Sequence, residues 1–277
     1  VEASALSGIG VGVPGTVDHV RGVVTQALNL GVEHMPLAEQ LSEVFARPVH
    51  VENDVNAAAL GVALLDGAAG LRPVAAGGDV AQAPAAQAPA AQEAAPSLAY
   101  LNLGTGLAVG LVLDGALWRG ARGAAGEIGH LPLDPQGPVC HCGQRGCLET
   151  MASGSGIAHQ WRVARSDPPP KAKALMELAT TDPLARAIAD RLIWAVASAV
   201  RVIVLSLDVP SVVLGGGVTR LGEQLTSPVR TLLQTWEDSS PFLASLAPSD
   251  RMRLLDTKAP VAAVGAALAG NLPGSQT

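Results

Sequence analysis

The chain of 277 residues is long enough for one large domain or two small ones. Its composition is 48% hydrophobic, and its formal net charge of −6 argues against a nucleic-acid-binding surface in this segment. The apolar stretch from Leu192 to Val200 is too short to span a bilayer, and no secretory signal occurs, so we expect a cytoplasmic protein without a membrane partner.

The first half of the chain alternates short strands and helices. A buried strand is predicted over 9–13, ending at a Pro-Gly turn, and a helix over 36–46. The apolar face of that helix comprises Leu37, Leu41 and Val44. A short strand is predicted over 49–51 and an alanine-rich helix over 54–65. Residues 67–97, rich in Ala, Pro, Gln and Gly, are predicted to form a disordered surface insertion, because they hold too little apolar surface to build a core.

The second half continues the alternation. Two strands are predicted on either side of Gly104–Gly106. A long helix is predicted from Pro183, a residue favoured in the first helical turn, to about Leu207. A further strand leads into Gly215–Gly217, and a helix is expected over 259–269. Strands and helices that alternate, with glycine turns at strand ends, indicate an α/β fold.

All three cysteines lie in the short run Cys-His-Cys-Gly-Gln-Arg-Gly-Cys, and a histidine stands ten residues before it. Three thiolates and one imidazole are a complete tetrahedral zinc set, and a shell of four protein ligands is closed, so this zinc would be structural. The predicted ligands are His130, Cys140, Cys142 and Cys147. The alternatives are a disulfide with one odd thiol, or three buried free cysteines. Thiolate ligands also require a reducing compartment.

Two carboxylates bracket these ligands: Glu127 lies three residues before His130, and Glu149 lies two residues after Cys147. Zinc would fix the backbone at both points. A positioned carboxylate suits a polyhydroxylated ligand, because it accepts hydrogen bonds that sugar hydroxyls donate. Each glutamate alone could be a solvated surface charge, but their shared attachment to one loop favours a sugar-binding role.

The motif Gly-Glu-Ile-Gly-His within residues 123–135, followed by Cys-His-Cys-Gly-Gln-Arg-Gly-Cys-Leu-Glu-Thr at 140–150, resembles the signature of the ROK (repressor/open-reading-frame/kinase) family. That family contains bacterial sugar kinases and sugar-responsive transcription repressors. Residues 12–18 and 51–61 resemble its sugar-site segments, and the resemblance extends from about residue 9 to residue 270.

The resemblance implies the two-lobed α/β fold shared by hexokinase, actin and heat-shock ATPases. The smaller lobe would cover residues 1–100, and the larger lobe, with the zinc loop 127–149, would cover residues 101–277. The implied ligands are structural zinc, Mg-ATP and a hexose or N-acetylhexosamine, and the implied assembly is a homodimer or homotetramer.

The resemblance also implies roles for individual residues. Asp54 aligns with the family's catalytic aspartate, which takes the proton of the attacking sugar hydroxyl. On the residues alone, an Asn-Asp helix cap is the alternative. The implied sugar-binding residues are Gly15, Thr16, Asn53, Glu127, His130 and Glu149. His130 would bind zinc with one ring nitrogen and donate to the sugar from the other.

Two glycine-rich turns would bind the nucleotide, because glycines let backbone N–H groups approach an anion. The implied nucleotide-binding residues are Gly104, Thr105, Gly106, Gly215, Gly216 and Gly217. On the residues alone, either segment could be an ordinary turn.

Family kinases begin with a strand and an Asp-x-Gly-Gly-Thr turn, the first phosphate loop, and that sequence does not occur in this chain. We therefore expect an N-terminal truncation that removes the first strands and part of the ATP site. The sequence predicts a glucokinase-like, ATP-dependent sugar kinase. The alternative is a sugar-responsive transcriptional regulator whose DNA-binding domain would precede the same sugar-binding body.

Overall fold

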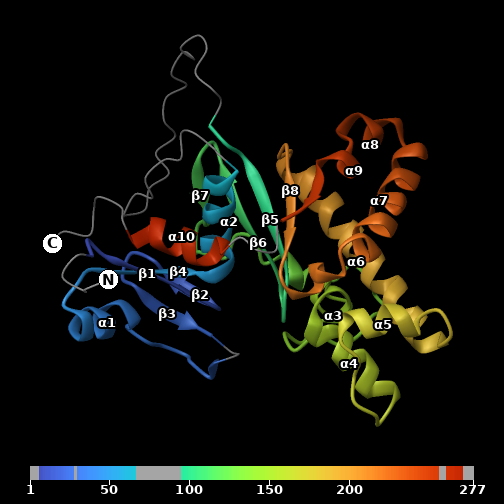
Figure 1. Ribbon diagram of the computed structural model, residues 1–277, viewed down its shortest axis with the longest axis horizontal. Helices are drawn as coiled ribbons and strands as arrows, with labels where there is room; N and C mark the ends of the chain where they lie inside the picture. Colours follow the sequence, from blue (N-terminus) through green and yellow to red (C-terminus); the bar gives the residue numbers. More distant parts are fainter. Residues whose placement is uncertain (1–5, 28–29, 67–94, 256–259, 271–277) are drawn as a thin grey trace. The chain divides into compact units, whose positions relative to one another are not determined.

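The fold is described from a computed structural model, which describes residues 6–27, 30–66, 95–255 and 260–270 (Figure 1). By the contacts that residues make, the chain divides into two units. Unit 1 comprises residues 1–97, 110–125 and 260–277, and unit 2 comprises residues 98–109 and 126–259. The predicted insertion lies outside the described residues except for positions 95–97, and the domain limits expected from the sequence stay a prediction.

Unit 1 contains two small strand pairs. β1 (Ile9–Val13) runs parallel to β4 (Val49–Asn53), with Val13 opposite Asn53. β2 (Thr16–Asp18) pairs antiparallel with β3 (Val23–Gln26). Five buried apolar residues form the core between these strands: Val13, Val17, Val24, Ala27 and Val51. Because β1 and β4 end in register, the segments that follow them start at the same edge of the pair.

Two helices of unit 1, α2 (Asp54–Leu65) and α10 (Val261–Gly270), pack against each other and against β1 (Figure 1). Both were predicted, α2 at its observed limits. Glycine makes the approach possible: a Cβ on Gly265 would lie 1.6 Å from the carbonyl oxygen of Ala57, and one on Gly10 would lie 1.6 Å from that of Ala266. These helices are thus held by backbone-to-backbone contact.

The helix predicted over 36–46 is α1 (Leu37–Phe45), and its predicted apolar face is only partly buried. Leu37 and Leu41 are half-buried, whereas 73% of Val44 is exposed. Helical spacing alone does not say how far a neighbouring element extends. Here β3 and β4 contact α1, and the apolar stripe runs past the part of the helix that they cover.

Unit 2 contains a parallel sheet in which β5 (Leu98–Leu103), β8 (Val212–Gly215) and β9 (Met252–Leu254) are neighbours in that order. β5 is buried along nearly its whole length, as expected for a strand covered on both faces. β6 (Leu107–Leu113) begins in unit 2, and its last three residues pair antiparallel with β7 (Ala116–Trp118) in unit 1.

The long helix of unit 2, α6 (Pro183–Leu207), has the predicted limits. The Asp182 side chain caps it by accepting from Leu184 N (2.8 Å) and Ala185 N (3.1 Å). Figure 1 shows α6 among the other helices of this unit. These are α3 (Glu149–Ala152), α4 (Gly154–Ala164), α5 (Ala172–Leu178), α7 (Glu223–Asp238), α8 (Pro241–Leu246) and α9 (Pro248–Arg251), with the 3-10 turns η3 (Ile128–His130) and η4 (Gly217–Leu221).

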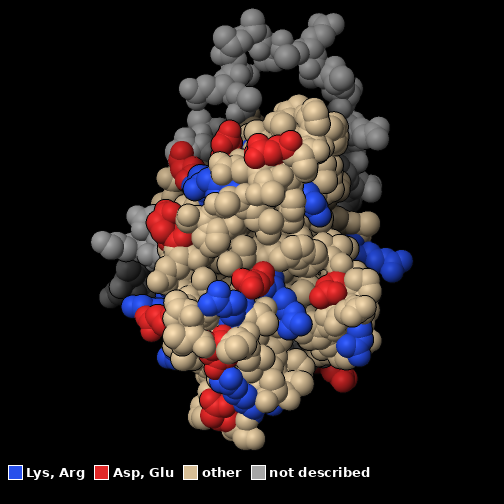
Figure 2. Space-filling model, turned by 90° about the vertical axis from the view of Figure 1, so that its right-hand side faces the viewer, with Lys and Arg blue, Asp and Glu red and all other residues tan. Residues whose placement is uncertain are grey.

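The surface carries charges of both signs, consistent with the modest net charge of −6. Acidic and basic side chains are interspersed on the face drawn in Figure 2. Within the described ranges, none of the helices combines the length and apolar character needed to cross a bilayer.

Candidate functional site

The predicted zinc ligands lie together on one loop of unit 2. His130 ends the turn η3, and two isolated bridges, Pro132 to Cys147 and Val139 to Arg145, fold the cysteine segment back on itself. Gly146 has φ +76° and lies so close to Asp134 that a Cβ would come within 1.6 Å of its carbonyl oxygen. The tight turn between the second and third cysteines therefore depends on glycine.

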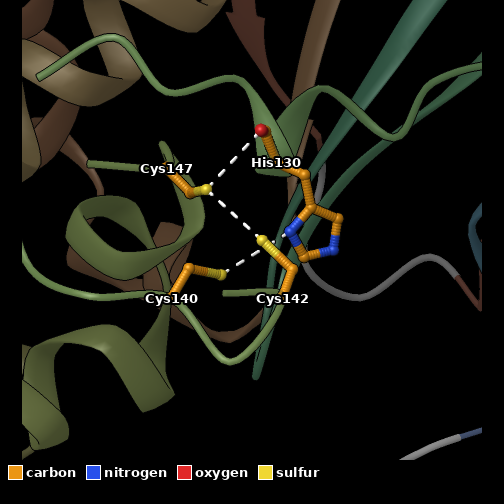
Figure 3. Close-up of side chains that lie close together, drawn as sticks. All are labelled: His130, Cys140, Cys142 and Cys147. Carbon is orange, nitrogen blue, oxygen red and sulfur yellow. Dashed lines mark hydrogen bonds between the residues drawn. The ribbon is translucent and has the colours of Figure 1, made fainter. Parts of the chain in front are cut away.

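Figure 3 shows the four side chains converging on a common centre. The Cys140 sulfur lies 3.6 Å from His130 Nδ1, the Cys142 sulfur lies 3.7 Å from that of Cys147, and all four ligand atoms lie within 4.8 Å of one another. Tetrahedral zinc places two sulfurs about 3.8 Å apart and a sulfur and a nitrogen about 3.6 Å apart. The donor set and its spacing fit zinc.

The alternatives to a metal site do not describe this geometry. The cysteines are free thiols, and 3.7 Å is far longer than a disulfide bond. Cys140 and Cys147 are buried but Cys142 is exposed, so the three are not a buried apolar set. Burial raises the pKa of Cys147 to about 12, whereas hydrogen bonds from Gln144 lower the pKa of Cys142 to about 6. A bound divalent cation would hold both as thiolates.

Gln144 is a residue of this loop that the sequence analysis missed. Its side-chain nitrogen donates to the His130 carbonyl (3.1 Å) and lies 3.5 Å from the Cys142 sulfur. It therefore joins the histidine and cysteine parts of the cluster. No sequence signal distinguishes it from any other polar residue of a tight turn.

Glu149 starts α3 and is fixed by two neighbours. One carboxylate oxygen accepts from Leu107 N (2.9 Å), and the other lies 3.6 Å from Nδ1 of His141. Gly106 leaves room for this contact, because a Cβ there would lie 2.6 Å from Glu149 Oε2. The zinc loop and the Gly104–Gly106 turn are thus joined within unit 2.

The other two predicted sugar-binding residues of this loop are Glu127 and His130. Glu127 is exposed immediately before η3. The Nε2 edge of His130 points away from the sulfurs (Figure 3).

The two glycine turns predicted to bind nucleotide both lie in unit 2. Gly104–Gly106 joins β5 to β6 and receives the start of α4, where Gly154 N donates to the Gly104 carbonyl (2.9 Å). In the second turn, Gly216 has φ +91°, and a Cβ would lie 2.6 Å from the Leu103 carbonyl oxygen. Sterics alone require glycine at this position, so nucleotide binding stays a prediction.

The predicted catalytic aspartate lies in unit 1 where β4 meets α2. Asn53 is the N-cap: its oxygen accepts from Val55 N (2.9 Å) and Asn56 N (3.0 Å), and its amide donates to the Gly15 carbonyl (3.0 Å). Asp54 follows as the first helical residue and lines a cavity of about 850 Å³ between β1 and α10. Burial raises the pKa of Asp54, opposed by the Val55 N–H. Thr16 begins β2 directly after Gly15.

Glu52, which the sequence analysis did not single out, carries a buried charge next to this turn. The residue is 1% exposed and forms an ion pair with Arg119. Despite the desolvation that burial imposes, hydrogen bonds and the guanidinium lower the pKa of Glu52 to about 2. Glu52 lies between Val51 and Asn53 in β4, and its partner stands 67 positions away, so the sequence carries no local signal of the pair.

The Glu52 pKa predicts how acid affects folding. The unfolded chain takes up a proton at Glu52 near pH 4.5, whereas the folded chain does so near pH 2, so the stabilisation is complete above pH 4.5 and is lost as pH falls toward 2. Denaturant unfolding followed by circular dichroism should show the wild type losing stability over this window. Glu52→Gln should lose less over it, although its stability at neutral pH is lower. Equal slopes in the two proteins, with exposed Glu177→Gln as control, would contradict this assignment.

The ROK family model matches residues 2–74 and 68–251. The chain is 31% identical over 245 residues to the glucokinase of Halalkalibacterium halodurans, covering 82% of this chain and 66% of that protein. It is 37% identical over 146 residues to the xylose repressor of Caldicellulosiruptor bescii, covering 53% of this chain and 31% of the repressor. The chain thus spans just under two thirds of this glucokinase and about one third of the repressor.

The fold comparison agrees with these matches. The crystal structure of the ROK hexokinase from Thermus thermophilus matches with a TM-score of 0.67 and 32% sequence identity, covering 95% of this chain and 78% of that one. The expected α/β fold of the hexokinase type is confirmed. Since the family model matches well over half of the residues, the chain belongs to the ROK family.

Proposed function

We propose that this protein is a sugar kinase that transfers the γ-phosphoryl group of Mg-ATP to a hydroxyl of a hexose or N-acetylhexosamine. The observation that carries the proposal is the position of Asp54. Asn53 already caps α2 by accepting from two backbone N–H groups, and Asp54 lines a cavity. A half-buried carboxylate with a raised pKa is suited to accept a proton. The similarity to a glucokinase over most of the chain supports the same reaction.

In this proposal the Asp54 carboxylate takes the hydroxyl proton as the sugar oxygen attacks the γ-phosphorus. A new oxygen–phosphorus bond forms, the bond to the bridging oxygen breaks, and ADP leaves. Glu127, Glu149 and the Nε2–H of His130 orient sugar hydroxyls, with Asn53, Gly15 and Thr16 as further contacts. The glycine turns 104–106 and 215–217 receive the nucleotide through backbone N–H groups.

The metal has no chemical step in this mechanism. We propose that zinc, held by the histidine and three cysteines, keeps His130 and Glu149 in fixed positions relative to each other. Pre-organised acceptors bind a sugar better, because the side-chain entropy lost on binding is smaller. We also propose that the protein assembles as a homodimer or homotetramer.

A second candidate function is that of a sugar-responsive regulator. It is favoured by the 37% identity over 146 residues to a xylose repressor. A regulator would bind sugar through the same zinc loop without transferring phosphate. The two functions are therefore separated by an assay of phosphoryl transfer.

Calorimetry against a panel of hexoses and N-acetylhexosamines tests the sugar site, and an ADP-coupled assay on the same protein tests the transfer. Glu149→Ala should weaken sugar binding by ~1.5–3 kcal/mol, because hydroxyl donors lose a charged acceptor. Glu149→Gln keeps an acceptor for Leu107 N and should lose less. Exposed Glu177→Ala serves as the control. Unchanged affinity in Glu149→Ala would remove Glu149 from the site, and sugar binding without transfer would favour the regulator.

A further inference from the structure

Both carboxylate oxygens of Glu52 are occupied in the interior of unit 1. One accepts from Arg119 through Nε (2.9 Å) and Nη2, and the other accepts from Asn53 N (3.0 Å) and Asn56 Nδ2 (3.1 Å). Burying an ion pair costs several kcal/mol in desolvation, and apolar residues of similar volume often stabilise a fold as well or better. The neighbours of this pair include the polar residues His50, Asn53 and Asn56, and such an arrangement indicates a role besides stability.

The contacts of Glu52 lead to the turn that carries Asp54. Asn53 N precedes the first helical residue, and Asn56 lies in the first turn of α2. Asn53 is fixed again by its bond to the Gly15 carbonyl. One carboxylate thus holds the Asn53 backbone before Asp54 and the Asn56 side chain after it, and a guanidinium in turn holds that carboxylate in place. Arg119 has its own anchor, since its carbonyl accepts from Ala125 N (3.0 Å).

The charges around the pair show what Arg119 contributes. Two imidazoles lie nearby: His50 Nε2 is 3.9 Å from Glu52 Oε2 and has no hydrogen-bond partner within the described chain, and His19 interacts electrostatically with both members. Burial and Arg119 lower the pKa of His19, so that imidazole is neutral at pH 7. Arg119 supplies a positive charge beside Glu52 at every working pH, because arginine does not lose its proton in proteins. Without it, an unpaired buried carboxylate would stand two residues from Asp54 and oppose its ionisation.

We propose that Arg119, acting through Glu52, is a positioning residue that orients the Asn53–Asp54 turn and keeps Asp54 ionised. The inference rests on the proposed role of Asp54 as the base, and neither Glu52 nor Arg119 contacts the reacting atoms in it. It adds to the kinase proposal a chain of contacts from Arg119, which follows β7, through Glu52 to the start of α2.

The test compares Arg119→Met with the double variant Arg119→Met/Glu52→Gln, and Arg122→Met is the control because Arg122 is exposed three residues away. In Arg119→Met, the acidic limb of the pH profile for kcat/KM should move up by about one pH unit. We expect kcat to fall about tenfold or more while the sugar KM changes much less. The double variant, which has no unpaired charge, should return the limb to its original pH. Arg119→Lys should lie between wild type and Arg119→Met.

An NMR titration of the Asp54 carboxyl separates this inference from the kinase proposal. If the wild type transfers no phosphate, the kinase proposal fails, but the Asp54 pKa should still rise in Arg119→Met and return in the double variant. If Arg119→Met does not fold, the Asp54 pKa is compared between the wild type, Arg119→Lys and the double variant, and these values test the positioning role. An Asp54 pKa that is the same in every folded variant would overturn the positioning role.

Discussion

Replacing Asp54 with asparagine should lower the rate of sugar phosphorylation by about 10²–10⁴-fold, the usual contribution of a general base. Asparagine keeps the size of the side chain and an oxygen that can accept from Val55 N, as Asp54 does at 2.9 Å. It cannot take up the proton of the attacking hydroxyl. The start of α2 should be preserved, because Asn53 supplies the cap. The effect is therefore confined to the transition state.

The kinetic pattern distinguishes a base from a binding residue. Sugar affinity, measured by calorimetry, should change far less than turnover when the lost interaction exists only in the transition state. Asp167→Asn, in an exposed loop of unit 2, is the matched control and should match the wild type. Equal activity of wild type and Asp54→Asn would leave Asp54 as an ordinary helix residue and require another base.

Features encoded by neighbouring residues could be predicted from the sequence. α2 and α6 were located at their observed limits because their start signals, Asn53-Asp54 and Asp182-Pro183, act within one helical turn. The convergence of the cysteines could be predicted for the same reason. All three lie within eight residues that include two glycines, so a local turn is enough to bring the thiols together. The convergence of the three thiols could therefore be predicted from spacing and residue type.

Contacts between distant segments were not predictable in this way. The burial of α1 depends on where β3 and β4 end, so the exposure of Val44 has no local signal. Glu52 and Arg119 are 67 positions apart, and Leu107 and Glu149 are 42 apart. Each pair forms only after strands have paired and loops have closed. The sequence thus predicted candidate site residues, whereas contacts between distant segments, such as Glu52 with Arg119, are visible only in the structure.

Loss of the metal site should also have a large effect on the protein. The wild-type protein is expected to contain close to one zinc per chain, and Cys142→Ser should lose most of it, because a neutral hydroxyl replaces a thiolate in a four-ligand shell. Zinc binding contributes folding free energy in small closed sites, so the loop 127–149 should become more susceptible to proteolysis in this variant. Sugar binding should fall with the metal, since Glu149 and His130 lose their fixed relation.

A variant of His141 identifies the ligand set, because His130, His141 and Glu149 form a second group whose ligand atoms also lie within 4.8 Å of one another. If zinc is held by His130 and the three thiolates, His141→Ala and Glu127→Ala should retain the metal, whereas His130→Ala and the cysteine variants should lose it. Loss of zinc in His141→Ala with full retention in Cys142→Ser would assign the metal to the second group. A wild-type protein that is folded and binds sugar without any metal would contradict a structural zinc, and the fixed arrangement of Glu149 would then rest on its bond to Leu107 N alone.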